Sequence, residues 1–177
     1  MNSRRLVLSS LVAIHCAVLP RLARADALQD AIAAIGRKDY ANAVRLLEPL
    51  ARGGQAQAQM RLALLYYHGH GVPENDALAR QWFERAARQG LAEAQFHLAN
   101  MYAFGLVALP PAEDPQRLAA QWYFEAARQG HAEAQYSLGI LFLTGSGVVA
   151  SPEEAKKWIE RAAAQGHADA KAYLAGK

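Results

Sequence analysis

The sequence predicts an all-α protein built as an α-solenoid, an array of antiparallel helix pairs. A short motif, a glycine followed by alternating alanines, occurs four times in the 177 residues, at Gly54, Gly90, Gly130 and Gly166, with spacings of 36, 40 and 36 residues. In three successive units a tryptophan stands eight residues before the closing glycine. A repeat of about 20–50 residues is typical of arrays in which each unit packs on its neighbours.

The chain begins with a segment that has the features of an export signal. Arg4 and Arg5 precede an apolar run over residues 6–19, and Ala23 and Ala25 form an A-x-A cleavage site. The run is shorter than the stretch of about 20 residues that spans a membrane. We therefore expect cleavage after Ala25, a periplasmic or secreted protein, and no stable membrane span afterwards. The paired arginines leave the twin-arginine route open beside the general secretory route.

Removal of residues 1–25 changes the charge and the cysteine count. The whole chain has 19 Lys+Arg and 16 Asp+Glu, and the signal contains four of the arginines and no acid, which leaves 15 basic and 16 acidic side chains and a formal charge of −1. No basic face then argues for nucleic acid. The single cysteine, Cys16, also leaves, which excludes a disulfide framework and a multi-cysteine metal site.

The period gives the order of the elements. Residues 26–54 are expected to form an N-terminal helical hairpin that caps the array. Three full units follow at 55–90, 91–130 and 131–166, and a capping helix at 167–177 ends the chain. Three or more such units usually suffice for a stable array.

Each full unit is expected to contain two helices. In the first half, small residues and one leucine recur on one face at helical spacing, and in the second half a tryptophan is followed by two alanines. Small side chains let partner helices approach closely, and a tryptophan fills the space between units. The tryptophans are Trp82, Trp122 and Trp158.

The boundaries of the helices carry recognisable signals. The four repeated glycines are expected in the left-handed conformation that ends a helix, which glycine adopts freely. Asp114 and Ser151 each precede a proline, the pattern of an N-cap followed by proline at the first helical position.

These residues resemble the Sel1-like repeat, a tetratricopeptide-type helical repeat. The resemblance runs from Gly54 to the end, through A-x-A-x-x-x-L-[AG]-x-x-[YF]-x-x-G-x-G-V and then A-x-x-W-[FYI]-x-x-A-A-x-x-G. It implies a right-handed α-solenoid that binds another protein in a regulatory or scaffolding role. The middle unit departs from the pattern, because Val107 replaces a loop glycine and four extra residues lie around positions 109–112. Penicillin binding, described for cysteine-rich relatives, is not implied here because the paired cysteines are missing.

No pattern in the chain indicates catalysis or a cofactor. Ser137, Ser146 and Ser151 fall in a helix, a glycine turn and an N-cap, and none has the strand–turn–helix context of a nucleophilic serine. We therefore expect a protein that is not an enzyme.

One histidine pair is a weak candidate for a metal site. His68 and His70 flank a glycine in a turn, with Glu74 and Asp76 close behind, and imidazole and carboxylate groups bind zinc. A polar turn is the alternative interpretation. A sensor that binds a small ligand at this turn also stays open.

A second apolar stripe runs along the first helix of each unit, beside the core positions. We call it the first-helix stripe, and it is predicted to line a concave groove that docks an apolar peptide or an amphipathic helix. Its Asn100 would bind the peptide backbone. The alternative is that tight coiling of the array buries the stripe. Its members are Met60, Leu64, Tyr67, Phe96, Asn100, Phe104, Tyr136, Ile140 and Leu143.

The expected function is therefore an exported adaptor whose partner is another envelope or secreted protein. An envelope hydrolase and a glycan-binding module are the alternatives from other classes. A hydrolase would need a convergent polar site, and a glycan module would place exposed aromatic rings such as those of Tyr67 and Tyr136 beside carboxylates.

Overall fold

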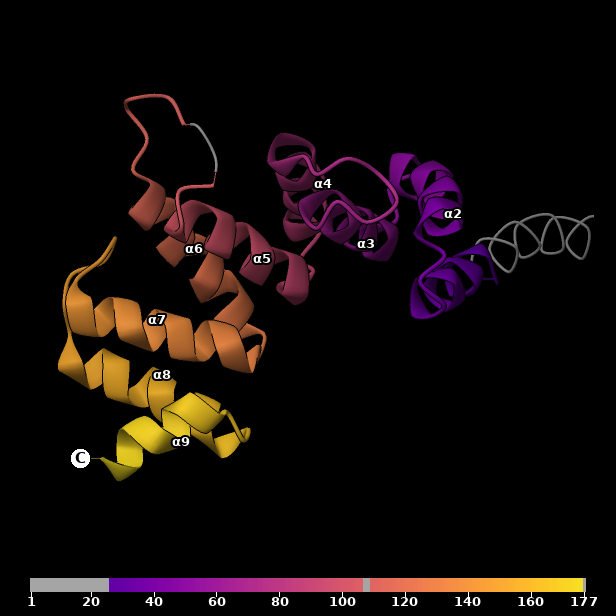
Figure 1. Cartoon of the computed structure of the whole chain (residues 1–177). Coiled ribbons are helices and arrows are strands. Elements are labelled where there is room, and N and C mark those ends of the chain that lie inside the picture. The colour runs from indigo at the N-terminus through magenta and orange to yellow at the C-terminus, as the bar shows by residue number, and fades with distance from the viewer. Residues whose placement is uncertain (1–25, 107–108, 177) are drawn as a thin grey trace, which may run out of the picture.

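A computed structural model of the chain describes residues 26–106 and 109–176, and within these ranges all regular structure is helical. The chain is helical over residues 26–36, and the labelled helices of Figure 1 follow in order. These are α2 (Tyr40–Arg52), α3 (Ala56–Tyr67), α4 (Asp76–Arg88), α5 (Ala92–Ala103), α6 (Pro115–Arg128), α7 (Ala132–Thr144), α8 (Pro152–Ala164) and α9 (Ala168–Ala175). The predicted all-α, right-handed solenoid is confirmed. The predicted export signal lies outside the described residues.

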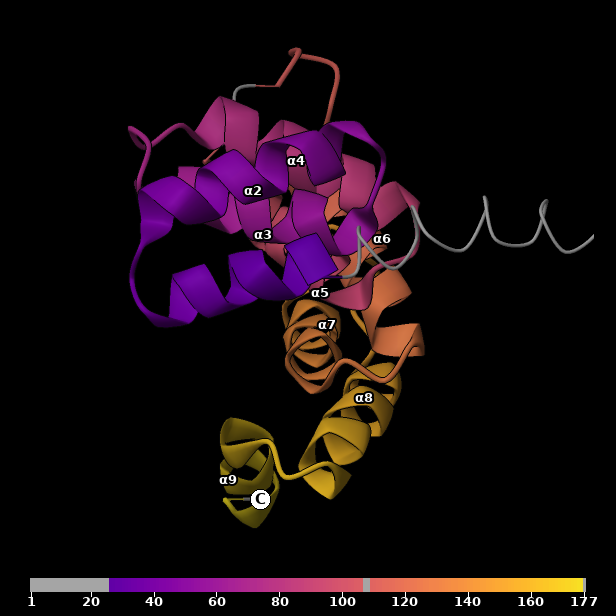
Figure 2. The ribbon, with the colours of Figure 1, turned by 90° about the vertical axis from the view of Figure 1, so that its right-hand side faces the viewer.

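The helices stack in chain order, so that each helix packs mainly on the one before it and the one after it. Figures 1 and 2 show the array running from α2 at one end to α9 at the other, with the connection between α5 and α6 standing out from it. Among the described helices, none is long and apolar enough to cross a membrane.

The helix ends form as the sequence predicts. Gly54, Gly90, Gly130 and Gly166 have φ of 88°, 89°, 90° and 98°, the left-handed region in which a side chain is strained. The Ser151 side chain accepts a hydrogen bond from the backbone N–H of Glu154, and Asp114 caps α6 in the same way. These signals are local, which is why they can be read without knowledge of the packing.

Small residues build the core. Most of the fully buried positions are alanines on facing helices, and a few large side chains such as Phe83 and Leu98 fill the space between them. Trp82 packs against both the N-terminal cluster of buried residues and the central one, and Trp158 is itself buried. The tryptophans therefore join successive units.

A glycine in two of the loops lets the chain press on a neighbouring helix. Gly71 has φ of 74°, and a Cβ there would lie 2.6 Å from the carbonyl carbon of Tyr40 at the start of α2. At Gly147 a Cβ would lie 2.1 Å from the backbone oxygen of Gln116 at the start of α6. Neither position has room for a side chain, so one loop packs directly against the start of α2 and the other against the start of α6.

A ladder of glutamine amides crosses the array. Gln59, Gln95 and Gln135 are buried, and each donates from Nε2 to the backbone oxygen of the residue eight positions earlier, at 3.0–3.1 Å. Each also accepts a hydrogen bond of 2.7 Å from the side-chain amide at the end of the next helix, that of Gln89, Gln129 or Gln165. Every rung therefore joins three consecutive helices. Lys171 stands at the fourth position, where the array ends.

Candidate functional site

The residues of the predicted stripe lie on α3, α5 and α7 or directly after α5, and they differ in burial. Met60 is 1% exposed and belongs to the central core, so its assignment to a groove surface is wrong. Phe104 is 73% exposed at the end of α5. The remaining seven are partly buried. The stripe is therefore part core and part surface.

The first residue of the stripe in each helix is covered by the following unit. Phe96 stacks on the ring of His131 with centroids 4.7 Å apart, and Tyr136 stacks on His167 at 4.6 Å. Each histidine is the N-cap of the first helix of the following unit, α7 or α9, where its Nδ1 accepts a hydrogen bond from a backbone N–H. Met60 stands at the same repeat position as the two aromatic residues. At this position Met60 is buried, and the two aromatic residues are partly buried.

Asn100 is tied to the helix beside it. Its Oδ1 accepts a hydrogen bond from the hydroxyl of Tyr123 on α6. Burial raises the pKa of Tyr123 to about 12, so this hydroxyl stays protonated and remains a donor. The predicted role of binding a peptide backbone would therefore fall mainly to the NH₂ group of Asn100, because its Oδ1 already accepts one hydrogen bond.

Histidines on the same face are held neutral by burial. Burial lowers the pKa of His97, against the opposing charge of Glu93, and the nearby charges of His131 and His68 lower it further. Burial also lowers the pKa of His131 against the charges of Glu133 and Glu93. Neutral imidazoles suit the stacking and capping contacts of these two rings.

A pocket of about 280 Å³ opens at the N-terminal end of this face. Ile35 and Tyr40 come from the N-terminal hairpin, four residues lie on α3 or at its end, and one is in the turn after it. The ring of Tyr40 stacks on His70 with centroids 4.4 Å apart and an interplanar angle of 13°. The full lining is Ile35, Tyr40, Arg61, Leu64, Leu65, His68 and His70.

Arg61 gives this pocket its charge. Its Nε is buried without a hydrogen-bond partner, and among the described residues no carboxylate forms a salt bridge with it. Three of the lining residues were predicted from the sequence, Leu64 as part of the first-helix stripe and His68 and His70 as weak metal ligands. Sequence reasoning missed the other four, Ile35, Tyr40, Arg61 and Leu65. One signal was available, because His97 and Ser137 occupy the repeat position of Arg61 in the next two units.

The histidine turn does not gather a set of metal ligands. The rings of His68 and His70 lie with centroids 5.5 Å apart, and the described residues contain no group of three or more His, Cys, Asp or Glu side chains that could hold a metal ion.

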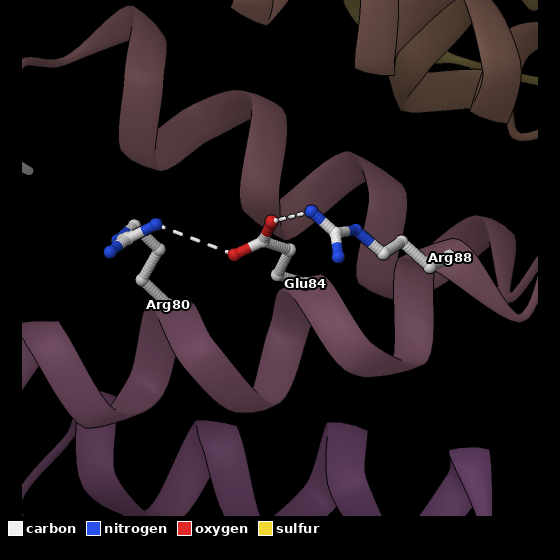
Figure 3. Close-up of polar contacts among 3 residues, drawn as sticks. All are labelled: Arg80, Glu84 and Arg88. Atoms are coloured by element: carbon white, nitrogen blue, oxygen red, sulfur yellow. Dashed lines mark hydrogen bonds and ion pairs between the residues drawn. The ribbon is translucent and has the colours of Figure 1, made fainter. Parts of the chain in front are cut away.

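A larger cleft of about 740 Å³ lies on the side of α4 and α6, beside the inserted residues Leu109 and Pro110. Its arginines are already paired. Figure 3 shows Glu84 between Arg80 and Arg88 on one helix, with Arg80 Nη1 at 3.4 Å and Arg88 Nη2 at 2.5 Å from its two carboxylate oxygens. Glu84 is 24% exposed, so water only partly screens its attraction to the two arginines. This cleft contrasts with the pocket at Arg61, whose guanidinium has no carboxylate partner.

Comparisons with known proteins give the repeat its family. The sequence model of the Sel1 repeat matches three consecutive segments, residues 56–91, 92–131 and 132–167. A search of curated proteins found no match.

Solved structures show the same architecture. The chain is 33% identical to a Sel1 repeat protein from Oxalobacter formigenes over 81% of its own length, with a TM-score of 0.73. It is 31% identical, with a TM-score of 0.77 over 85% of its length, to a protective antigen present in uropathogenic Escherichia coli strains. The chain spans only 57% and 32% of those two proteins. The cysteine rich protein B of Helicobacter pylori, at 23% identity and a TM-score of 0.55 over 82% of this chain and 96% of that one, shares the fold.

Proposed function

The chain belongs to the Sel1 repeat family, and from this premise we propose that it is an exported, non-catalytic adaptor that docks a peptide segment or helix of another envelope or secreted protein. Sel1 repeats generally mediate protein–protein interaction. The docking surface is the exposed part of the first-helix stripe, together with the pocket at its N-terminal end.

The observation that carries this proposal is the row of partly exposed apolar side chains on three successive first helices. Leu64, Ile140 and Leu143 are only partly buried, and Phe104 is almost fully exposed. Isolated apolar residues are common on protein surfaces, but a contiguous row of them indicates a binding site. Helices of a partner are bound in such grooves through apolar side chains at spacings of three and four residues.

A capture experiment tests the proposed surface. The tagged chain is crosslinked in its source cells, and the proteins bound by the wild type are compared with those bound by an Ile140→Glu/Phe104→Glu variant. Both positions reach the surface, and a carboxylate at each would have to be desolvated by an apolar partner. Phe124→Glu is the matched control, because Phe124 is an exposed aromatic residue, 41% accessible, on α6 beside the larger cleft.

We expect a partner that is retained by the control variant and lost by the double variant. Circular dichroism must show that both variants keep the helical content of the wild type. Equal capture by all three proteins would contradict the proposed surface, and loss in the Phe124→Glu variant alone would move the site to the cleft beside α6.

The proposed export has a separate test. The full chain is produced in bacterial cells with and without an Ala23→Asp/Ala25→Asp change, since the cleavage site needs small residues. We expect the unchanged protein outside the inner membrane with Asp26 as its first residue, and the changed protein to keep its leader. An unprocessed wild-type protein in the cytoplasm would contradict the proposal.

A further inference from the structure

The pocket at Arg61 has the charge of an anion site and the walls of an apolar one. Arg61 is its one permanently charged residue, and its lining contains no carboxylate. The other side of the pocket is formed by aliphatic groups of Ile35, Leu64 and Leu65. A ligand that satisfies both parts must carry an anionic group and an aliphatic group close together.

The state of Arg61 indicates that the pocket lacks a partner. A buried donor without an acceptor is unfavourable, and most buried polar groups in proteins are paired. Arg80 and Arg88 show the usual arrangement in this same chain, since both share the carboxylate of Glu84. Arg61 has no such carboxylate among the described residues, although its Nε is buried. The enclosed Nε is not the group that a ligand would reach; a carboxylate entering the pocket would bind the Nη groups of Arg61, since guanidinium binds carboxylate through paired hydrogen bonds.

The size of the pocket limits the ligand to about one residue. Sites for drug-sized molecules measure about 300–1,000 Å³, and this pocket is slightly smaller at 280 Å³. The last residue of a peptide carries a carboxylate and its side chain on the same Cα, so a C-terminal leucine or valine offers both groups within this space. An internal glutamate carries its carboxylate at the tip of a flexible chain with no aliphatic branch beside it.

The wall of the pocket is fixed before any ligand arrives. Tyr40 and His70 are stacked on each other, and the turn that holds His70 is pressed on the start of α2, where Gly71 leaves no space for a side chain. A preformed site binds with a smaller loss of conformational entropy than one that must be ordered by its ligand.

We propose that this pocket binds the C-terminal residue of a partner protein, with the carboxylate on Arg61 and an aliphatic side chain against Ile35, Leu64 and Leu65. The inference rests on the proposed function, because it names the end of the partner that the first-helix face receives. C-terminal carboxylates are a recurrent means of recognising a peptide.

The test is a titration of the purified full chain with an N-acetylated pentapeptide, four alanines followed by leucine, as the free acid and as the C-terminal amide. Two-dimensional ¹H–¹⁵N NMR reports the dissociation constant and the affected residues. We expect the acid to shift the amide signals of Leu64, Leu65 and His68 and to bind at least tenfold more tightly than the amide. Arg61→Gln should abolish that preference, Arg61→Lys should retain part of it, and Arg88→Gln, the matched arginine control, should leave it unchanged.

Four results would overturn the proposal. The acid and the amide may bind equally, the amidated peptide with an internal glutamate may bind as tightly as the acid, or decanoate may bind more tightly than the peptide, which would make the pocket a fatty-acid site. Absence of any shift in these signals would also overturn it. The proposed function is tested apart from this, since its variants at Ile140 and Phe104 lie outside the pocket. Loss of the partner in those variants with equal binding of acid and amide refutes the pocket alone, and the converse refutes the adaptor surface alone.

Discussion

Replacing Gln95 by methionine tests whether the glutamine ladder stabilises the array. Methionine has the length and the unbranched shape of glutamine, so the substitution removes the hydrogen bonds and leaves the packing volume nearly unchanged. Two hydrogen bonds are lost, one from Nε2 to the Ala87 backbone oxygen at 3.1 Å and one of 2.7 Å from the Gln129 amide to Oε1.

The geometry sets the size of the effect. A typical hydrogen bond contributes about 0.5–1.5 kcal/mol net to stability, and a buried group left without a partner costs about 1–3 kcal/mol. The Ala87 oxygen keeps the N–H of Gly90 at 2.9 Å, and Gln129 is exposed enough to bind water instead. Two bonds contribute about 1–3 kcal/mol together, and because neither freed group is left without a partner, we expect the free energy of unfolding to fall by about 1–2 kcal/mol, in the lower part of that range.

Urea unfolding followed by circular dichroism measures this change. With a slope of about 2 kcal/mol per molar urea, the loss lowers the midpoint by about 0.5–1 M. A double-mutant cycle with Gln129→Met isolates the bond between the two side chains, for which we expect a coupling of about 0.5–1.5 kcal/mol. A Gln95→Met variant as stable as the wild type, or a coupling near zero, would show that the ladder does not contribute to stability.

Three further experiments, with five substitutions in all, test the burial, the loop contacts and the histidines. Met60→Ala should cost about 2–5 kcal/mol in urea unfolding, as expected for a buried side chain, and Leu64→Ala clearly less because Leu64 is partly exposed; equal costs would return Met60 to the surface. Gly130→Ala should cost about 1–2 kcal/mol for its left-handed backbone, and Gly147→Ala more, because a Cβ there meets backbone at 2.1 Å; similar melting temperatures would refute the close contact. Burial lowers the pKa of His131 in the folded protein, so between the two pKa values the unfolded chain binds a proton that the folded chain does not. The free energy of unfolding should therefore be greatest above the unfolded pKa of about 6.5 and should decrease as the pH falls below that value. His131→Asn should flatten this dependence in urea melts between pH 8 and pH 5, and an unchanged slope would contradict it.

The sequence predicts those parts of the fold that depend on neighbouring residues. The left-handed glycines, the caps at Asp114 and Ser151 and the helical faces are determined within one or two helical turns, and the structure confirms them. The repeat also displays the ladder glutamines. Their role could not be inferred, because it depends on how the ends of two alternate helices, such as α4 and α6, meet at the start of the helix between them.

The burial of the first-helix stripe could not be predicted for a related reason. Phe96 is covered by His131, which lies 35 positions later in the chain, and the periodicity of one helix contains no information about such a cover. The pocket at Arg61 depends on Ile35 and Tyr40, which belong to the N-terminal hairpin and lie outside the Sel1 repeats. Comparison of one repeat with another cannot find a site to which residues outside the repeats contribute one wall.

Departures from the repeat separate the positions that hold the array together from those that distinguish one unit from another. Core alanines, ladder glutamines and turn glycines recur because every unit must stack on the next in the same way. The position of Arg61 is free of this requirement, since His97 and Ser137 replace it in the following units, and no contact shared by all three units needs a guanidinium there. An arginine that the repeat does not require, and that finds no carboxylate in the described chain, is best explained by a ligand. Phe124 is also a departure from the repeat, because Glu84 and Glu160 occupy its position in the units before and after it. In the cleft beside Phe124, however, Arg80 and Arg88 already form ion pairs with Glu84. The pocket at Arg61 therefore ranks above the larger cleft as the proposed site of partner binding.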